Sequence, residues 1–340
     1  MRWFRRKARA LPWRFSPTPY EVWLSEVMLQ QTQIATVIPF YSRFLHTFPT
    51  VERLAHGPME RVLELWSGLG YYRRARDFHR AAQVVTDKFA GQFPRDYEQA
   101  RSLPGVGDYT AKAVLSIAYN LPYAVMDGNV ARVMARLEAI GGAPGESAFR
   151  RTVERELELL LSPRQPGAFN QALMELGQTV CLPRSPKCQV CPLRSWCRAR
   201  KSGRPEEFPA PKARRAAEES HLAVAVIAHR GRVALIRGLD AGLLADMWNF
   251  PSAFGRTRTA ARRNLAAKLE AIAPHRISLR SAQSELRHNI TFRSIRVHLF
   301  SAELPTLAKQ LRWFPLSRLH GAAISQLARK IADRIVHGKS

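Results

Sequence analysis

The sequence predicts a protein of two domains, in which an all-helical domain precedes an α+β domain. Residues 18–200 read as successive helical segments separated by Pro and Gly. Residues 201–220 are rich in Pro and charge and poor in apolar side chains, as is typical of an interdomain linker. After this stretch the hydrophobic period changes, which indicates strands. We therefore expect a helical domain over 1–200, a linker over 201–220 and an α+β domain over 221–340.

The individual elements follow from the spacing of the apolar side chains. In the first half, this spacing predicts helical segments at 18–48, 59–70, 74–89, 110–120, 129–140 and 149–161. The Arg-rich start interleaves apolar residues with arginines, as an ordinary first helix does. In the second half, residues 221–238 read as two strands around an Arg-Gly turn, and 290–300 alternate as a strand. Residues 324–338 return to helical spacing.

The charge balance favours a polyanionic partner. The 340 residues include 53 Lys and Arg against 27 Asp and Glu, which gives a net charge of +26. Nucleic acid and an anionic membrane surface are the first partners to consider, because cationic side chains bind phosphates and release counterions. No apolar run approaches the roughly twenty residues that span a bilayer, and the N-terminus lacks the apolar core of a secretory signal. We therefore expect a cytoplasmic protein.

All four cysteines of the chain lie in residues 181–197, with six, two and five residues between them. Disulfides are rare in cytosolic proteins, so the group predicts a metal site. Zinc sites usually pair two short knuckles across a longer excursion, whereas a single tight loop suits the corners of one 4Fe–4S cluster. We expect a 4Fe–4S cluster, with zinc as the alternative. The ligands would be Cys181, Cys188, Cys191 and Cys197.

A second pattern is the stretch LPGVGDYTA, residues 103–111, which lies between two helical segments. Gly105 and Gly107 allow a tight turn whose backbone N–H groups can approach a phosphate, and the next helix adds the positive end of its dipole. This pattern predicts a helix-hairpin-helix. A plain turn between helices is the alternative, which the cysteine loop downstream disfavours.

Two carboxylates stand in patterns that suit acid and anion chemistry. Glu26 lies in WLSEVMLQQTQ, a segment that is apolar on every side. Such a carboxylate must be paired or used, and burial would raise its pKa toward that of a general acid. Asp127 precedes an amphipathic helix, where it could be a plain N-cap or an anion beside a developing cation. Cleavage of a glycosidic bond through an oxocarbenium ion uses two such carboxylates. A Glu26 satisfied by a neighbouring arginine is the other alternative.

Seven motifs follow one another in the first half, namely LPWR, WLSEVMLQQTQ, LWSGLGYY, LPGVGDYTA, MDGNV, FNQALMELG and the cysteine loop. In this order they closely resemble the bacterial adenine DNA glycosylase (MutY) family of the helix-hairpin-helix glycosylase superfamily. The second half is similar more loosely, through GLLADMWNFPS and its strand order, to the Nudix-like domain with which the family reads 8-oxoguanine. The resemblance implies a multidomain fold, with an all-α helix-hairpin-helix glycosylase domain that carries a 4Fe–4S loop and an α+β Nudix-like domain.

The resemblance also implies catalytic roles. Glu26 would protonate adenine at N7 and later activate water, and Asp127 would stabilise the oxocarbenium sugar. Tyr109 stands where bifunctional relatives carry a Schiff-base lysine, which implies a monofunctional enzyme. Asn129 and Arg9 would supply polar contacts near the reaction centre.

Contacts with DNA are implied as well. A base in a duplex must be flipped out before cleavage, and the gap must be filled. Gln31, Leu69 and Tyr71 would fill it and touch the opposite base, with packing at a helix end as the alternative for Leu69 and Tyr71. Trp13 and Leu29 would wall the adenine pocket. The expected contact set is Arg9, Trp13, Leu29, Gln30, Gln31, Leu69, Tyr71, Gly105, Gly107 and Thr291.

Two departures from the family pattern concern the second half. After NFPSAFG the chain has RTRTAARRNLAAKLEA, with one carboxylate where a hydrolase of this fold needs several for Mg²⁺. We therefore expect no nucleotide hydrolysis. The loop that commonly carries Phe-Ser-His is Ile290-Thr291-Phe292 here, so it keeps a hydroxyl but lacks the imidazole.

The expected function is removal of adenine opposite 8-oxoguanine or guanine in double-stranded DNA, by a monomeric enzyme. A related glycosylase for thymine or uracil opposite guanine is one alternative. A non-catalytic, cluster-bearing DNA-binding protein is the other. The presence of both Glu26 and Asp127 disfavours the last, because a binding protein needs no acid and anion at one site.

Overall fold

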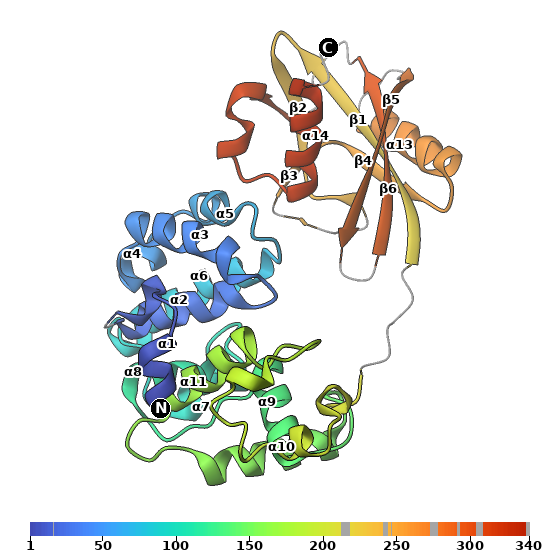
Figure 1. Cartoon of the computed structure of the whole chain (residues 1–340). Helices are drawn as coiled ribbons and strands as arrows, with labels where there is room; N and C mark the ends of the chain where they lie inside the picture. The colour runs from blue at the N-terminus through green and yellow to red at the C-terminus, as the bar shows by residue number, and fades with distance from the viewer. Residues whose placement is uncertain are drawn as a thin grey trace. The chain divides into compact units, whose positions relative to one another are not determined.

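A computed structural model describes residues 1–15, 17–211, 218–240, 244–245, 247–272, 278–290, 293–303 and 309–337. The chain divides into two compact units, which Figure 1 colours by position in the sequence. Unit 1 comprises Met1–Gly57 and Asp77–Ala213, and unit 2 comprises Pro58–Arg76 and Arg214–Ser340. Segment 58–76 thus groups with the C-terminal half, although it lies within the helical half of the sequence. No helix in the described ranges is long and apolar enough to cross a membrane.

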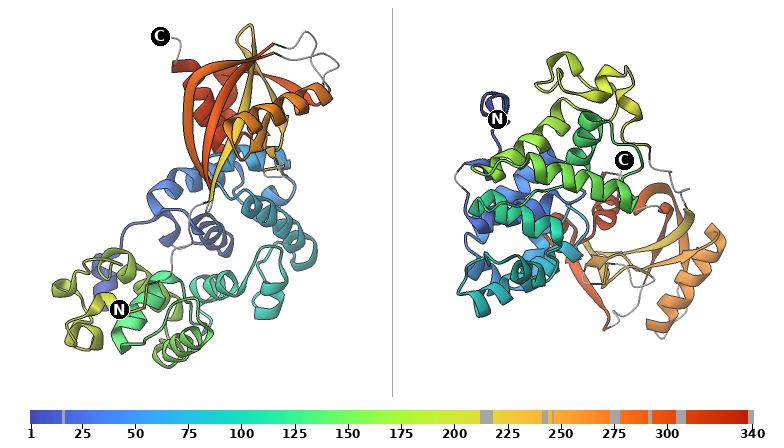
Figure 2. Two further views of the ribbon diagram at one scale, coloured as in Figure 1. Left: turned by 90° about the vertical axis from the view of Figure 1, so that its right-hand side faces the viewer. Right: turned by 90° about the horizontal axis from the view of Figure 1, so that it is seen from below.

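Unit 1 is all-helical, and Figure 2 shows its helices from two further sides. Helix α6 (Arg73–Phe89) begins in unit 2 and continues into unit 1. The other elements of unit 1 are α1 (Arg2–Lys7), η1 (Pro12–Arg14), α2 (Pro19–Leu29), α3 (Ile34–Thr47), α4 (Val51–Ala55), α7 (Tyr97–Ser102), α8 (Asp108–Tyr119), α9 (Gly128–Glu138), α10 (Ser147–Leu160), α11 (Pro166–Thr179), η2 (Cys188–Val190), α12 (Arg198–Lys201) and η3 (Pro205–Glu207).

Helix α2, which carries Glu26, is deeply buried in unit 1. Thr18 and Glu21 form a capping box at its start, and every side chain over 22–28 is buried. The sequence predicts one helix over 18–48, but the structure has two, α2 and α3. Gln31 has a φ of 56°, a left-handed conformation that a continuous helix cannot contain. The break leaves the end of α2 free to line a pocket.

The predicted helix-hairpin-helix is formed by α7 and α8. Asp96 caps α7 by accepting a hydrogen bond of 2.9 Å from the Gln99 N–H. Between the helices, Gly105 has a φ of +72°, and a Cβ added to it would lie 2.5 Å from the Cβ of Asp77. Gly107 is the N-cap of α8, with a φ of −92°. The hairpin therefore requires glycine at position 105, whereas the backbone at 107 is one that other residues adopt.

Unit 2 contains helix α5 (Met59–Trp66) and a mixed sheet. Within the described residues the sheet has seven strands in the order β3-β2-β1-β6-β5, and β4 also pairs with β1 while β7 pairs with β2. The β1–β6 pair is parallel and the other pairs are antiparallel. The strands are β1 (Glu218–His229), β2 (Arg232–Arg237), β3 (Trp248–Asn249), β4 (Ser252–Gly255), β5 (Leu279–Ile290), β6 (Arg293–Ala302) and β7 (Leu311–Pro315).

Helices α13 (Arg258–Ile272) and α14 (Gln326–His337) pack on opposite faces of this sheet. Side chains alternate along a strand, so Leu222 of β1 joins the core under α14 and Ala223 joins the core under α13. A short η5 (Leu316–Gly321) precedes α14. The predicted α+β class, the turn between β1 and β2 and the last helix are confirmed, whereas α13 is an element that was not predicted. Thr291 and Phe292 lie outside the described residues.

Candidate active site

One pocket in unit 1 brings together eight of the residues that the sequence singles out. It has a volume of about 840 Å³ and is lined from the end of α2 and the starts of α8 and α9. A smaller adjoining pocket shares Glu26 and Leu29 with it and is also lined by Trp13. The predicted residues on the large pocket are Arg9, Glu26, Leu29, Gln30, Gln31, Tyr109, Asp127 and Asn129.

Glu26 is buried, and its hydrogen-bond partner is a phenol. The Tyr109 hydroxyl donates to Oε2 of Glu26 over 2.8 Å. Burial raises the pKa of Glu26 to about 7, although the hydrogen bond from Tyr109 lowers it; the charge of Asp127 raises it and that of Arg14 lowers it. A large share of Glu26 therefore carries a proton near neutral pH. This is the protonation state that a general acid requires.

Tyr109 remains a proton donor throughout the physiological range. Burial, with the nearby charges of Glu26 and Asp127, holds the pKa of this phenol well above its usual range. Lys112, the nearest lysine along α8, forms an ion pair with Asp108 over 3.0 Å at the exposed start of the helix. On α8, the hydrogen-bond partner of Glu26 is therefore Tyr109, whereas Lys112 pairs with Asp108.

Asp127 is both an N-cap and a pocket residue. Its Oδ1 accepts a hydrogen bond of 2.7 Å from the Val130 N–H at the start of α9. Its Oδ2 accepts one of 2.8 Å from the Asn129 side chain, and Asn129 in turn accepts one of 2.9 Å from Arg132. These contacts fix the carboxylate beside the pocket that contains Glu26. The two interpretations of Asp127 from the sequence are therefore compatible.

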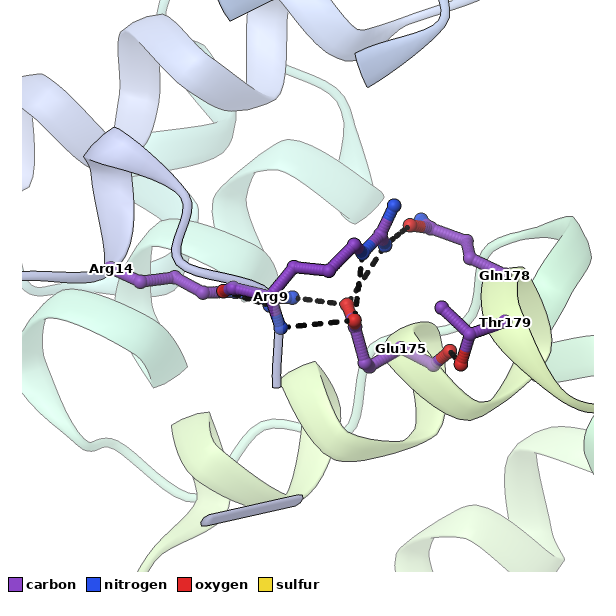
Figure 3. A network of polar contacts seen from close by, with 5 residues as sticks. All are labelled: Arg9, Arg14, Glu175, Gln178 and Thr179. Carbon is purple, nitrogen blue, oxygen red and sulfur yellow. Dashed lines mark hydrogen bonds and ion pairs between the residues drawn. The ribbon is translucent and has the colours of Figure 1, made fainter. Parts of the chain in front are cut away.

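Glu175 of α11 lines neither pocket but holds two arginines that do, and the sequence did not single it out. Its side chain is fully buried and forms ion pairs with Arg9 over 2.7 Å and with Arg14 over 2.9 Å. Figure 3 shows both guanidinium groups meeting this one carboxylate. The available signal was an acidic residue inside the apolar stretch ALMELG, the same kind of pattern that pointed to Glu26.

Two of the predicted DNA contacts have unusual backbone conformations. Gln31 and Tyr71 both have left-handed backbones, with φ of 56° and 48°, and such residues are concentrated at functional sites. Tyr71 is 44% exposed, whereas Leu69 is buried. Both belong to segment 58–76 and so to unit 2. Gln30 donates to the Thr110 hydroxyl over 3.3 Å at the start of α8.

The cysteine loop is held by Arg136 of α9, a second residue that the sequence did not reveal. Arg136 is buried and donates to the carbonyls of Leu182 over 2.6 Å and of Pro183 over 2.9 Å. One of its nitrogens lies 3.4 Å from the Sγ of Cys181, and the Cys197 thiol donates to the Arg136 carbonyl over 3.3 Å. The guanidinium of Arg136 thus contacts the start of the loop, and its backbone carbonyl contacts the last cysteine.

The four thiols fit an iron–sulfur cluster. Burial raises the pKa of Cys188 and of Cys191, and the nearby Cys181 and Cys197 raise it further. Thiols this close ionise together only when a metal centre supplies positive charge. In the described part of the chain, no three His, Cys, Asp or Glu side chains are placed to hold one metal ion. The six, two and five residues between the cysteines suit a 4Fe–4S cluster better than a single zinc ion.

Three family models match the chain. Residues 24–159 match the HhH-GPD superfamily of base excision DNA repair proteins, and residues 223–334 match the NUDIX domain. Residues 181–197, which hold all four cysteines, match the iron–sulfur binding domain of endonuclease III.

Known proteins resemble the chain in sequence and in structure. The human adenine DNA glycosylase is 33% identical over 391 residues, which cover 97% of this chain and 72% of the human protein. A thermostable thymine-DNA glycosylase has a TM-score of 0.53 at 25% identity, over 59% of this chain and 93% of that one. A trapped covalent intermediate of endonuclease III with DNA has a TM-score of 0.51 at 27% identity, over 59% of this chain and 92% of that one.

Proposed function

Because this chain belongs to the adenine DNA glycosylase family, we propose that it removes adenine opposite 8-oxoguanine or guanine in double-stranded DNA. The observation that carries the proposal is a buried Glu26, with its pKa raised to about 7 by burial, in a pocket that it shares with Asp127. Together these residues form an acid and an anion at one site.

In the proposed reaction, protonated Glu26 donates its proton to N7 of the flipped adenine. The bond between the sugar C1′ and N9 then breaks, and its electron pair leaves with the base. Asp127 stabilises the oxocarbenium ion that remains, and its contacts with Val130 and Asn129 keep it oriented toward the pocket. Water adds to C1′ and gives its proton to Glu26, which restores the acid. No amine takes part, so the enzyme is monofunctional and leaves an abasic site.

Other residues of this chain would bind and orient the DNA. Arg9, Trp13 and Leu29 line the two adjoining pockets and would hold the extruded base. Gln30 and Gln31, at the break between α2 and α3, would contact the duplex where the base leaves the stack. The further contacts in this proposal are Leu69, Tyr71, the hairpin residues Gly105 and Gly107, and Thr291, which would contact 8-oxoguanine.

The role that we propose for the iron–sulfur loop is structural. A bound 4Fe–4S cluster supplies cross-links that fold residues 181–197, with Cys181, Cys188, Cys191 and Cys197 as the ligands. Arg184, Lys187 and Arg194 within this loop, and Arg198 directly after it, would then present positive charge to the DNA backbone. The proposal also includes a monomeric enzyme that acts in the cytoplasm, where thiols stay reduced.

A panel of duplexes tests the proposal. Each duplex carries one mispair, namely A opposite 8-oxoguanine, A opposite G, T opposite G or U opposite G, and base release is measured with and without alkali. We expect adenine release from the first two duplexes and strand breaks only after alkali. Release of thymine or uracil in place of adenine would contradict the proposal. It would favour the alternative, a glycosylase for thymine or uracil opposite guanine, as the name of the similar thymine-DNA glycosylase suggests for that protein. Binding without release of any base would identify a DNA-binding protein.

A further inference from the structure

Within unit 2, a buried polar network joins the segment that carries Leu69 and Tyr71 to helix α14. The Ser67 hydroxyl donates a hydrogen bond of 2.6 Å to the carbonyl of Ile324. It accepts two from Arg329 of α14, over 3.1 Å from Nε and over 2.7 Å from Nη2. These three bonds use the one donor and both acceptor sites of a hydroxyl. Because Ser67 is only 5% exposed, protein groups rather than solvent satisfy it.

A second, longer hydrogen bond reaches the same carbonyl. The buried Tyr72 hydroxyl donates to the Ile324 carbonyl over 3.5 Å and accepts from the Gly68 N–H over 3.5 Å. The carbonyl of Ile324 is therefore bonded to a residue two positions before Leu69 and to the residue directly after Tyr71. The two anchors flank both of the residues that were expected to fill the gap in the DNA.

The receiving side of the network is a rigid part of unit 2. Ile324 is fully buried in the core under α14 and forms a bridge with Trp248 of β3. The next residue, Ser325, accepts a hydrogen bond of 3.0 Å from the Ala328 N–H at the start of α14. The network thus ties the segment to the sheet and to the helix at once.

Loop 67–72 between the anchors is held in one shape by its own contacts. The Trp66 indole N–H and the Arg74 guanidinium each donate to the Gly70 carbonyl over 3.2 Å. The guanidinium also lies over the rings of Trp66 and Tyr71, 5.6 Å and 5.3 Å from their centroids. Tyr71 is nevertheless 44% exposed. A loop of fixed shape takes its position from its anchors, so they decide where this exposed ring lies relative to the sheet.

Ordinary packing of one segment on another is the simpler explanation. Two observations favour more than that. Apolar side chains would suffice for packing, whereas a buried hydroxyl and a half-buried guanidinium lose hydration that the network has to offset. The network also lies within a few residues of Leu69 and Tyr71 and not elsewhere along α5.

We propose that Ser67 and Arg329 are positioning residues of the excision reaction, which fix loop 67–72 to the α+β fold of unit 2. This fold then places the residues that fill the gap left by the extruded adenine. The inference rests on the proposed function. Loss of either partner leaves the internal contacts of the loop intact but frees the loop to move relative to α14, so the extruded state is less populated and the base leaves more slowly.

The test uses the fluorescence of a 2-aminopurine placed beside the target adenine, opposite 8-oxoguanine, because this base brightens when its neighbour leaves the stack. Full-length, cluster-loaded wild type, Ser67→Ala and Arg329→Gln are compared at saturating protein, together with single-turnover adenine release. Both variants should give a smaller rise in fluorescence and release adenine about tenfold more slowly. The double variant should match the single variants, because both residues act through one contact.

Glu60→Gln is the matched control. Glu60 of α5 pairs with Arg237 of β2 over 3.5 Å, which is a second contact between segment 58–76 and the α+β fold. The two side chains are 48% and 42% exposed, and an exposed ion pair contributes little. This variant should therefore keep the fluorescence and the release rate of the wild type.

The outcomes distinguish this inference from the function on which it rests. If wild type releases adenine and both variants keep its full rise in fluorescence, the network is only structural and the inference is overturned, whatever their unfolding temperatures are. An equal loss of fluorescence in Glu60→Gln would overturn it as well. If Ser67→Ala does not fold, Arg329→Gln, at a side chain that is only half-buried, decides the question. If wild type releases no adenine from any duplex, the proposed function fails and this inference fails with it.

Discussion

Two buried glutamates in unit 1 show how single residues acquire different chemistry from their partners. Glu26 and Glu175 both lie on apolar helices, and burial acts to raise the pKa of each. For Glu26 the result is a raised pKa, because one phenol is its hydrogen-bond partner. For Glu175, hydrogen bonds from Arg9 and the charge and hydrogen bond of Arg14 outweigh burial and lower the pKa. The first can therefore be an acid, whereas the second is a fixed anion.

The phenol of Tyr109 leads to a prediction about the product. Because a phenol cannot form an imine with the sugar, the wild-type protein should leave abasic sites that break only after heat or alkali. Borohydride added during the reaction should trap far less protein on DNA than it does with a bifunctional glycosylase assayed in parallel. Efficient trapping would contradict the monofunctional mechanism. Lys112→Met would then show whether the lysine that pairs with Asp108 is responsible.

At the residue scale, the sequence predicts which side chains are functional better than it predicts their contacts. Glu26 could be recognised because an acidic residue in an apolar helix must be paired or used. Its phenol partner comes from a residue 83 positions away, so it could be proposed only through the resemblance. Glu175 had the same local pattern and was missed, because its partners, Arg9 and Arg14, lie at sequence separations of 166 and 161. Contacts over such distances depend on the tertiary fold.

Among the elements, the helix-hairpin-helix offers a matched pair of glycines for a stability test. Gly105→Ala would force a left-handed backbone on alanine and bring its Cβ to 2.5 Å from that of Asp77. The left-handed conformation alone costs roughly 1–2 kcal/mol. Gly107→Ala is the control, because a Cβ there meets nothing within 4 Å. Thermal unfolding should therefore shift down by roughly 2 to 8 °C for Gly105→Ala and little for Gly107→Ala. Equal shifts would refute this account of the hairpin.

The elements also mark where apolar spacing loses its predictive power. Long stripes such as those of α9 and α10 are easily recognised. The break between α2 and α3 is not, because Gln31 adopts a left-handed conformation that its residue type does not demand. Helix α13 buries Ala261, Leu265 and Leu269, a narrow stripe among arginines. This spacing of four residues and the many Ala, Leu and Arg side chains favour a helix, so α13 could have been predicted from the sequence and was missed.

For the whole molecule, the sequence predicted the fold class of each half better than the boundaries between the two units. The all-helical and α+β halves were both expected, and both are present. Segment 58–76 was expected with the helical half, yet in the structure it groups with the C-terminal unit. The predicted boundary came from the composition of the linker over 201–220. The grouping of segment 58–76 with residues after this linker depends on packing between distant segments, which linker composition does not show. The predicted domain limits remain a prediction.

In the proposed reaction, Glu26 is the general acid of a DNA glycosylase that removes adenine. The most direct test of this role is single-turnover adenine release at pH 7 by Glu26→Gln, from a duplex with A opposite 8-oxoguanine. The amide of Glu26→Gln cannot donate the proton that adenine needs to leave, so we expect the rate to fall at least about 10²-fold. Binding of the duplex should be retained. The control is Glu156→Gln, at a glutamate of α10 that pairs with Arg155 over 2.9 Å and lines neither pocket, and it should behave as wild type. Adenine release by Glu26→Gln at the wild-type rate would contradict the account.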